Sequence, residues 1–222
     1  MSWYAKPSGG YAIGSTEGTA NILEIAALYQ VRSYRDEAIA GICGNVAAES
    51  ALNPWRWQSD VVNLSNGYGL FQFTPASGYM GVSVAGKAPN MSTSIQTAGA
   101  LPSDGAAQVT VQADDLLSKW VSTCWRSYWS PSSYPSLYSL RTHILNTYGN
   151  GSTLTLAQFS QITDVQSATF AFLACFEGPA VPNLNARVSY ANQALAIIQG
   201  APPTPPTPPN FPLWLLFKIR WR

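Results

Sequence analysis

The chain has 222 residues, of which 10% are charged and 12% are aromatic, and its formal net charge is +1. Three positive charges, Lys218, Arg220 and Arg222, lie at the very end, so the rest of the chain has a net charge of −2. A body that binds nucleic acid is normally basic, so this composition argues against nucleic-acid specificity. The length allows one sizeable core with residues left for additional segments. A surface poor in charge and rich in polar and aromatic side chains is compatible with sugar-like ligands.

Residues 1–17 are predicted to form an extended N-terminal arm. They contain glycine and aromatic residues, and they lack both the charged and the apolar region of a secretory signal peptide. A helix is predicted to begin near Thr19, because apolar residues then recur on one face. This face consists of Ile22, Ile25, Ala26 and Tyr29. The helix opens a domain that we expect to span residues 18–200.

A second predicted helix ends in a carboxylate, Glu49. Its start is indicated by Ser33 and Asp36 at the spacing of a capping box, and its apolar face consists of Ile39, Ile42, Cys43 and Val46. Glu49 lies on the same face, seven residues after Ile42. Apolar surroundings and the negative end of the helix dipole would both raise the pKa of Glu49. A raised pKa suits a general acid, although many helix-end glutamates are simply solvated.

A glycine-rich element, Gly67–Pro75, follows within a region of loops and short strands at 54–80. Its aromatic and apolar residues between glycines favour a β-hairpin that ends at Pro75. The glycines permit close approach of the backbone to a ligand, and Gln72 offers both a donor and an acceptor to sugar amides. We interpret this element as a cleft wall; an ordinary structural hairpin is the alternative.

Further helices are predicted after a small-residue segment at 80–107, which is expected to be a long surface insertion or flap. Their apolar faces lie within 113–124, 137–145, 164–176 and 187–198, and Thr155 with Gln158 predicts a short capped helix. The aromatic residues at 125–129 either stack on sugars or pack internally.

Two polar residues of the last helices stand out. Glu177 is a second helix-terminal carboxylate, because Gly178 and Pro179 stop its helix. Arg187 opens the last helix and can pair with Glu177. Glu177 either takes part in the cleft, where it would orient Glu49, or caps the turn that follows.

The composition changes abruptly after Gly200. Residues 201–210 predict a stiff polyproline II linker that reaches about 30 Å. Residues 211–222 are apolar and then alternate apolar with basic side chains, which indicates a C-terminal anchor. The anchor is expected to bind a partner's sheet, a membrane interface or a larger assembly. No apolar run of the chain is long enough to predict a membrane-spanning helix.

The cysteines and the single histidine predict neither a disulfide nor a cofactor. Cys43, Cys124 and Cys175 are odd in number and lie in apolar helical patterns, so we expect buried thiols. No cluster of histidine, cysteine and carboxylate residues has the spacing of metal ligands, so no metal or other cofactor is expected.

An ordered series of short motifs resembles the phage tail lysozyme domain of virion-associated cell-wall hydrolases, within the lysozyme and lytic transglycosylase superfamily. The matching stretches are Gly44 to Ser50, Asn53-Pro54, Trp57-Gln58, Gly67 to Ala76 and Phe176 to Asn183. The resemblance implies an α+β, mainly α-helical, lysozyme-like fold with a small β-hairpin lobe beside the cleft. It also implies cleavage of the MurNAc–GlcNAc β-1,4 bond of bacterial peptidoglycan by a muramidase or a lytic transglycosylase.

The resemblance places Glu49 as the proton donor, with Ser50, Tyr68, Gly69, Gln72 and Glu177 as substrate-binding residues. The second catalytic group is left open by the sequence. Asp60 is the only acidic residue between Glu49 and Asp104, so it is a candidate nucleophile or base if it faces Glu49. Otherwise water held by Gln72, or internal attack that forms an anhydro sugar, completes the reaction.

The biological setting is left with three alternatives. The first is a muramidase carried in the phage tail, attached to virion proteins through residues 201–222, which opens the host wall during genome entry. The second is an endolysin that releases progeny. The third is a catalytically silent tail component that binds glycan. The Pro-rich linker and the anchor favour the first.

Overall fold

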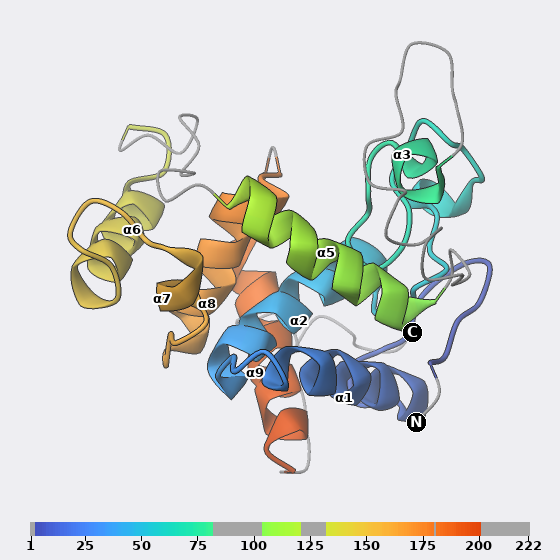
Figure 1. Cartoon of the computed structure of the whole chain (residues 1–222), viewed down its shortest axis with the longest axis horizontal. Coiled ribbons are helices and arrows are strands. Elements are labelled where there is room, and N and C mark those ends of the chain that lie inside the picture. Colours follow the sequence, from blue (N-terminus) through green and yellow to red (C-terminus); the bar gives the residue numbers. More distant parts are fainter. Residues whose placement is uncertain (1–2, 82–103, 121–131, 180, 201–222) are drawn as a thin grey trace, which may run out of the picture.

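The structure is a computed structural model that describes residues 3–81, 104–120, 132–179 and 181–200. These parts of the chain are mainly helical (Figure 1). The elements are α1 (Thr16–Gln30), α2 (Asp36–Ser50), η1 (Gln58–Asp60), α3 (Ala76–Met80), α5 (Gly105–Lys119), α6 (Pro135–Thr147), α7 (Leu156–Phe159), α8 (Val165–Phe172), η2 (Leu173–Glu177) and α9 (Leu184–Ile198). The predicted linker, the C-terminal anchor, the aromatic segment 125–129 and most of the predicted insertion at 80–107 lie outside the described residues.

Helix α2 is the centre of the fold. It packs mainly against α9 and α8, and also against α1. Every residue from Ala38 to Val46 is buried, which is typical of a helix that is enclosed on all sides. The sequence predicted a single apolar face, so the burial of the remaining faces is a consequence of the surrounding helices.

Two glycines of α2 allow this close packing. A Cβ atom on Gly44 would lie 2.5 Å from the backbone oxygen of Arg187, and one on Gly41 would lie 2.7 Å from the backbone nitrogen of Thr169. A larger residue at either position would therefore push α8 or α9 away. The close approach of α9 brings Arg187 beside the C-terminal half of α2.

Helix α1 has the predicted apolar face but begins at Thr16, three residues before the predicted start, and the capping predicted for α2 is wrong. The Ser15 side chain caps α1, and the predicted face of this helix is buried. The N-cap of α2 is Arg35, which makes no side-chain capping bond. Ser33 lies in the preceding turn with a φ of 63°, so the capping box predicted from Ser33 and Asp36 does not form.

The predicted β-hairpin is a compact loop, and the described residues contain no strand. Tyr68 forms isolated bridges with Trp57 and Phe73, and Tyr68 and Phe73 exchange backbone hydrogen bonds of 3.2 and 2.8 Å. Gly69 and Gln72 have φ values of 80° and 47°, so the chain reverses between the bridged residues and leaves no length for a ladder. The helical part of the predicted fold class is confirmed, but its β lobe is absent from the described residues.

The predicted helix 164–176 is present, and it ends in a π-helical turn. Asp164 caps α8, and its side chain accepts from the Ser167 backbone N–H at 2.8 Å. The helix continues as η2, where the N–H of Gly178 donates to the carbonyl of Leu173 at 2.7 Å. This wider turn changes the direction in which Glu177 projects from the end of the helix.

The cysteine prediction is confirmed for Cys43 and wrong for Cys175. Cys43 is a free, buried thiol, and burial raises its pKa to about 12. Cys175 is disulfide-bonded, whereas Cys124 lies outside the described residues. An apolar pattern around a cysteine reports its burial but not its distance from another cysteine, and that distance decides whether a bond forms.

The later helices follow the sequence pattern with shifted starts. Thr155 and Gln158 form the complete capping box expected for α7. Helix α5 begins at Gly105, ahead of its predicted apolar face. Helix α9 begins at Leu184, so Arg187 lies one turn inside it and not at its start.

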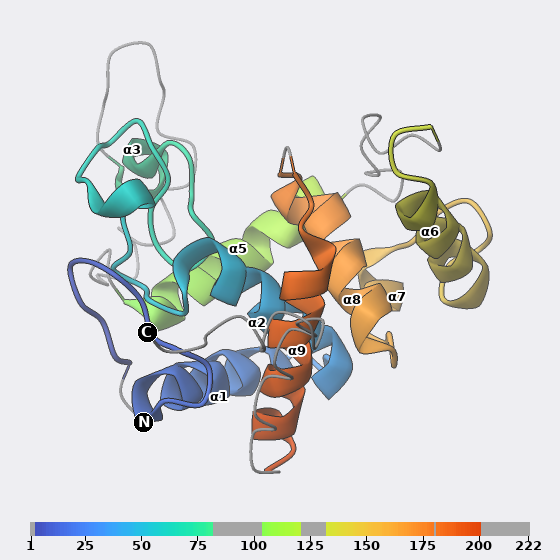
Figure 2. The same cartoon turned by 180° about the vertical axis from the view of Figure 1, so that it is seen from behind.

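The arrangement places the loop region 51–81 with α3 at one end of the molecule and α6 at the other. Helices α2, α8 and α9 lie between these ends, as both views show (Figures 1 and 2). In the parts of the chain that the structure describes, no helix is long and apolar enough to cross a membrane.

Candidate active site

A cleft of about 340 Å³ lies where the C-terminal ends of α2 and η2 meet the loop that follows α2. It is lined by Glu49, Arg56, Gln58, Ser59, Phe71, Gln72, Thr74, Glu177 and Pro179. All of these except Phe71 and Pro179 carry polar side chains. The cleft therefore joins three residues of the predicted site, Glu49, Gln72 and Glu177.

Glu49 occupies the last turn of α2, but its surroundings differ from the prediction. Ala51 and Leu52 both have positive φ values, of 49° and 61°, so the chain leaves the helix sharply after Glu49. The Glu49 side chain is 23% exposed, and its Oε1 accepts from Nη2 of Arg187 at 2.6 Å. The prediction of an apolar niche for Glu49 is wrong, because this carboxylate is paired with an arginine.

Arg187 is buried, and all three nitrogens of its guanidinium donate hydrogen bonds. Besides Glu49, its Nη1 donates to Oδ1 of Asn45 at 3.0 Å and its Nε donates to the carbonyl of Pro182 at 3.2 Å. Asn45 in turn donates to the carbonyls of Gly41 and Thr169. The sequence suggested that Arg187 pairs with Glu177, but the ion pair is made with Glu49 instead.

One signal for this network was present in the sequence. Asn45 and Glu49 are four residues apart, so they lie on the same face of α2. A polar stripe on a helix that is otherwise apolar indicates an internal partner for those groups, because buried polar atoms are normally hydrogen-bonded. The pattern did not identify Arg187, which lies 138 positions from Glu49.

Glu177 is a half-buried acid that lines the cleft with part of its side chain and turns one carboxyl oxygen inward. Its Oε1 is buried and makes no hydrogen bond within the part of the chain that the structure describes. Burial raises the pKa of the Glu177 carboxyl well above its usual range, and the negative charge of Glu49 raises it further, while Arg187 opposes the shift. Of the two carboxyl groups, Glu177 is therefore the one whose surroundings favour the protonated form.

Aromatic side chains supply the apolar surroundings on one side of Glu177. Phe176 precedes it in η2 and packs against Phe172, with ring centroids 5.1 Å apart. From the loop, Phe71 meets Phe176 edge to face at 6.3 Å. These contacts surround the end of η2 with apolar surface, which disfavours a charged carboxylate. The apolar environment predicted for Glu49 is thus found at Glu177.

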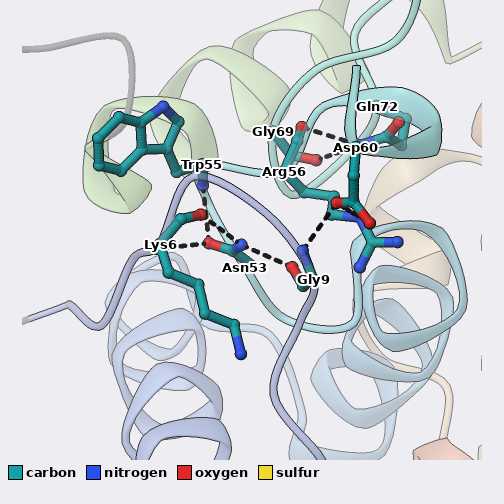
Figure 3. Close-up of polar contacts among 8 residues, drawn as sticks. All are labelled: Lys6, Gly9, Asn53, Trp55, Arg56, Asp60, Gly69 and Gln72. Atoms are coloured by element: carbon teal, nitrogen blue, oxygen red, sulfur yellow. Dashed lines mark hydrogen bonds and ion pairs between the residues drawn. The ribbon is translucent and has the colours of Figure 1, made fainter. Parts of the chain in front are cut away.

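The Asp60 carboxylate is engaged by the loop and by the N-terminal arm. It belongs to η1, and its Oδ1 lies 3.0 Å from Nε of Arg56 and accepts from the backbone N–H of Gly9 at 2.7 Å (Figure 3). Asp60 is not among the residues that line the cleft. The role of Asp60 as a nucleophile or base stays a prediction, and the contacts that the structure shows for it are with Arg56 and Gly9.

Gln72 lines the cleft, but its amide donors are already engaged. Its Nε2 donates to the backbone carbonyls of Gly69 at 2.9 Å and of Arg56 at 3.3 Å (Figure 3). Only Oε1 of Gln72 is left for a ligand or a water molecule. The prediction that Gln72 offers both a donor and an acceptor is therefore reduced to the acceptor.

Ser50, Tyr68 and Gly69 form the framework of the site and do not line the cleft. The Ser50 hydroxyl is buried and donates to the Val46 carbonyl at 3.0 Å. Tyr68 is buried against Trp57, with ring centroids 4.6 Å apart, and burial raises its pKa. A Cβ atom on Gly69 would lie 2.4 Å from the side chain of Gln108. These residues fix the loop and do not present side chains to a ligand.

This geometry can be compared with known proteins. The sequence matches the phage tail lysozyme family over residues 20–198. The chain belongs to the phage tail lysozyme family. Membership of this family supports the general class of phage peptidoglycan hydrolases, with a glycosidase type of activity. Within the described residues, no group of histidine, cysteine and carboxylate side chains is placed to hold a metal ion.

One curated relative is a morphogenesis protein of a phage. The chain is 26% identical, over 199 residues, to "Morphogenesis protein 1" of Bacillus phage B103. The match covers 89% of this chain and 44% of the relative. The chain thus spans less than half of that protein's length, and the relative's printed name concerns the longer protein.

Proposed function

We propose that this phage tail lysozyme cleaves the MurNAc–GlcNAc β-1,4 bond of bacterial peptidoglycan with a proton held by the Glu49–Glu177 pair. The observation that carries the proposal is the meeting of both carboxyl groups in one cleft beside a single buried arginine. Two carboxyls in such surroundings do not both ionise readily, so one of them keeps a proton near neutral pH. Cleavage of a glycosidic bond needs such a proton on the leaving oxygen.

In the proposed mechanism Glu49 donates to the glycosidic oxygen and Glu177 supplies the proton. Glu49 is the more accessible carboxyl, with 23% of its side chain exposed. In the resting enzyme Glu49 is ion-paired to Arg187 and the neutral Glu177 holds the proton. Transfer from Glu177 to Glu49, and then to the leaving oxygen, leaves both carboxyls ionised, and Arg187 offsets part of this charge. The proton released by the attacking water or sugar hydroxyl then returns to the pair and restores the resting state.

The oxocarbenium-like centre is then captured in one of two ways. Water held by Oε1 of Gln72 would give a hydrolysed, reducing product, whereas attack by the sugar's own hydroxyl would give an anhydro product without consuming water. The mechanism does not use Asp60 as a nucleophile, because its carboxylate is engaged by Arg56 and Gly9. Mass spectrometry of the products separates the two outcomes by the mass of one water molecule.

We place the activity in the phage tail, where it would open the host wall during genome entry. The name of the B103 relative, a morphogenesis protein, supports a virion setting over release of progeny. In this proposal the linker 201–210 and the anchor 211–222 attach the domain to other virion proteins. Deletion of residues 201–222 should lower incorporation into particles while the isolated protein keeps its wall-degrading activity.

The enzymatic proposal is tested by zymography of the purified protein on peptidoglycan, followed by product analysis. Clearing by the wild-type chain and loss of clearing by Glu49→Gln are expected. If the folded wild-type protein binds peptidoglycan but produces no clearing, it would instead be a tail component that binds glycan without cleaving it.

A further inference from the structure

Among the described residues that line the cleft, Arg56 is the one positively charged side chain. Part of its guanidinium has no hydrogen-bond partner there. Its Nε lies 3.0 Å from Oδ1 of Asp60, and its side chain is 25% exposed. Within the described ranges its two Nη groups make no hydrogen bond, so their N–H donors remain available to a ligand. The catalytic pair does not engage them, and the mechanism proposed above does not use them.

The backbone of Arg56 is fixed by the loop that forms the cleft wall. Its carbonyl accepts from the N–H of Gly69 at 2.8 Å and from Nε2 of Gln72 at 3.3 Å (Figure 3). The position of the Arg56 Cα is therefore set by the same residues that shape the cleft. What is left to determine is the direction of the long side chain.

Asp60 determines that direction, and the N-terminal arm holds Asp60. The Asp60 carboxylate accepts from the backbone N–H of Gly9 at 2.7 Å. The arm itself is bound by Asn53, whose amide donates to the carbonyls of Lys6 and Gly9, both at 2.8 Å, and accepts from the N–H groups of Lys6 and Trp55 (Figure 3). The arm, Asp60 and Arg56 thus form one connected network.

The geometry of this ion pair favours recognition of an anion over stabilisation of the fold. Asp60 and Arg56 are 36% and 25% exposed, and exposed pairs contribute little to stability. Because Asp60 occupies the Nε side, the guanidinium keeps its two Nη groups, which together match the two oxygens of a carboxylate. Along the same cleft, the charge of Glu49 is offset by Arg187, and the raised pKa of Glu177 favours its neutral form, so both acids repel an incoming anion less than free carboxylates would.

We propose that Arg56 binds a carboxylate of the substrate, and that Asp60, anchored by the N-terminal arm, is a positioning residue for Arg56. The inference rests on the proposed function, since the sugar backbone of peptidoglycan carries peptide stems whose carboxylates supply the anion. The enzyme would then distinguish glycan that carries stems from bare glycan of the same backbone.

Arg56→Gln tests the proposal by a comparison of two substrates. One is peptidoglycan with intact peptide stems, and the other is the same glycan after its stems have been removed by an amidase. On the stem-bearing glycan, Arg56→Gln is expected to raise KM about tenfold or more, because a charge-assisted bidentate contact is lost. On stripped glycan its KM should match that of the wild type, and kcat should change little on either substrate.

Three further variants sharpen the test. Arg56→Lys keeps the charge without the planar fork, so it should restore only part of the lost KM. Asp60→Asn should raise KM less than Arg56→Gln and should leave kcat within a few fold, whereas loss of a nucleophile would abolish kcat. Arg35→Gln is the matched control, because it removes an exposed positive charge at the opposite end of α2.

Equal KM changes of Arg56→Gln on both substrates, or no change on either, would overturn the assignment of Arg56 while leaving the glycosidase intact. If the wild type cleaves neither substrate, the proposed function fails. The binding of glycan by the full-length protein then tests whether Arg56 recognises a carboxylate. In that case calorimetry with soluble stem-bearing and stripped glycan fragments is expected to show weaker binding of only the stem-bearing fragments to Arg56→Gln. Equal affinities of wild type and variant for those fragments would contradict the inference.

Discussion

The two walls of the cleft handle polar groups in opposite ways. On the helical wall, Glu49 and Arg187 are paired across α2 and α9, and Glu177 is buried beside them. On the loop wall, Arg56 and Asp60 form a pair that is partly exposed, and Arg56 keeps unused donors. In our proposals the helical wall holds the proton and the loop wall binds an anionic group of the substrate. Catalysis and recognition would then be carried by different walls of one cleft.

The largest expected effect is loss of turnover when either glutamate is replaced by glutamine. Glu49→Gln and Glu177→Gln keep the shape of the side chains, but glutamine at either position cannot take up a proton and pass it on. Each should lower kcat by about 10²–10⁴-fold, the range typical of general acid catalysis. Steady-state cleavage of purified peptidoglycan provides the measurement, with circular dichroism as the control for folding. Full activity of Glu177→Gln would remove it from the proton path and leave Glu49 as sole donor.

The helical wall should also be the more sensitive to loss of its cation. Arg187→Met keeps the length of the side chain but leaves Asn45 and Glu49 without their shared donor. Breaking a buried pair costs about 3–5 kcal/mol, and because Glu49 is partly exposed we expect about 3 kcal/mol. Urea unfolding measures the change. A cost below about 1 kcal/mol would show that water replaces the guanidinium without penalty.

On the loop wall the effect on stability should be smaller and should be coupled to binding. Asn53→Ala removes the amide that holds Lys6 and Gly9 of the arm, which should cost about 2 kcal/mol because buried backbone groups lose partners. The same variant should raise KM for stem-bearing glycan in the direction of Asp60→Asn. If stability falls but KM stays constant, the arm supports the fold without positioning Arg56.

A pH dependence of stability distinguishes the walls by a smaller effect. The folded-state pKa of Glu177 is raised above its ordinary value of 4.5, so the folded protein binds a proton that the unfolded chain releases at neutral pH. The contribution of Glu177 is thus present in full below the unfolded pKa and is lost as the pH rises toward the folded pKa. Glu177→Gln should reduce the decline in unfolding free energy between pH 5 and pH 8, measured in urea. An unchanged decline would mean that Glu177 is ionised in the folded protein.

The sequence alone predicted the main helices and three of the residues that line the candidate cleft, Glu49, Gln72 and Glu177. The period of apolar residues predicted α1 and α2, and the spacing of Thr155 and Gln158 predicted the cap of α7, because these features depend on neighbours within one or two turns. The same local information placed Glu49 at a helix end, and the ordered motifs indicated the family. These predictions needed no knowledge of contacts between distant segments.

Only the tertiary structure decided the electrostatics of the cleft. The partner of Glu49 lies 138 positions away, and Glu177 enters the apolar niche through a π-helical turn that no periodic pattern indicates. Asp60 was a plausible second acid on its position in the sequence, but the turn around it directs its carboxylate to Arg56 and Gly9. The sequence gives the type and position of each ionisable side chain. Its partners and its exposure to water depend on how separate segments pack.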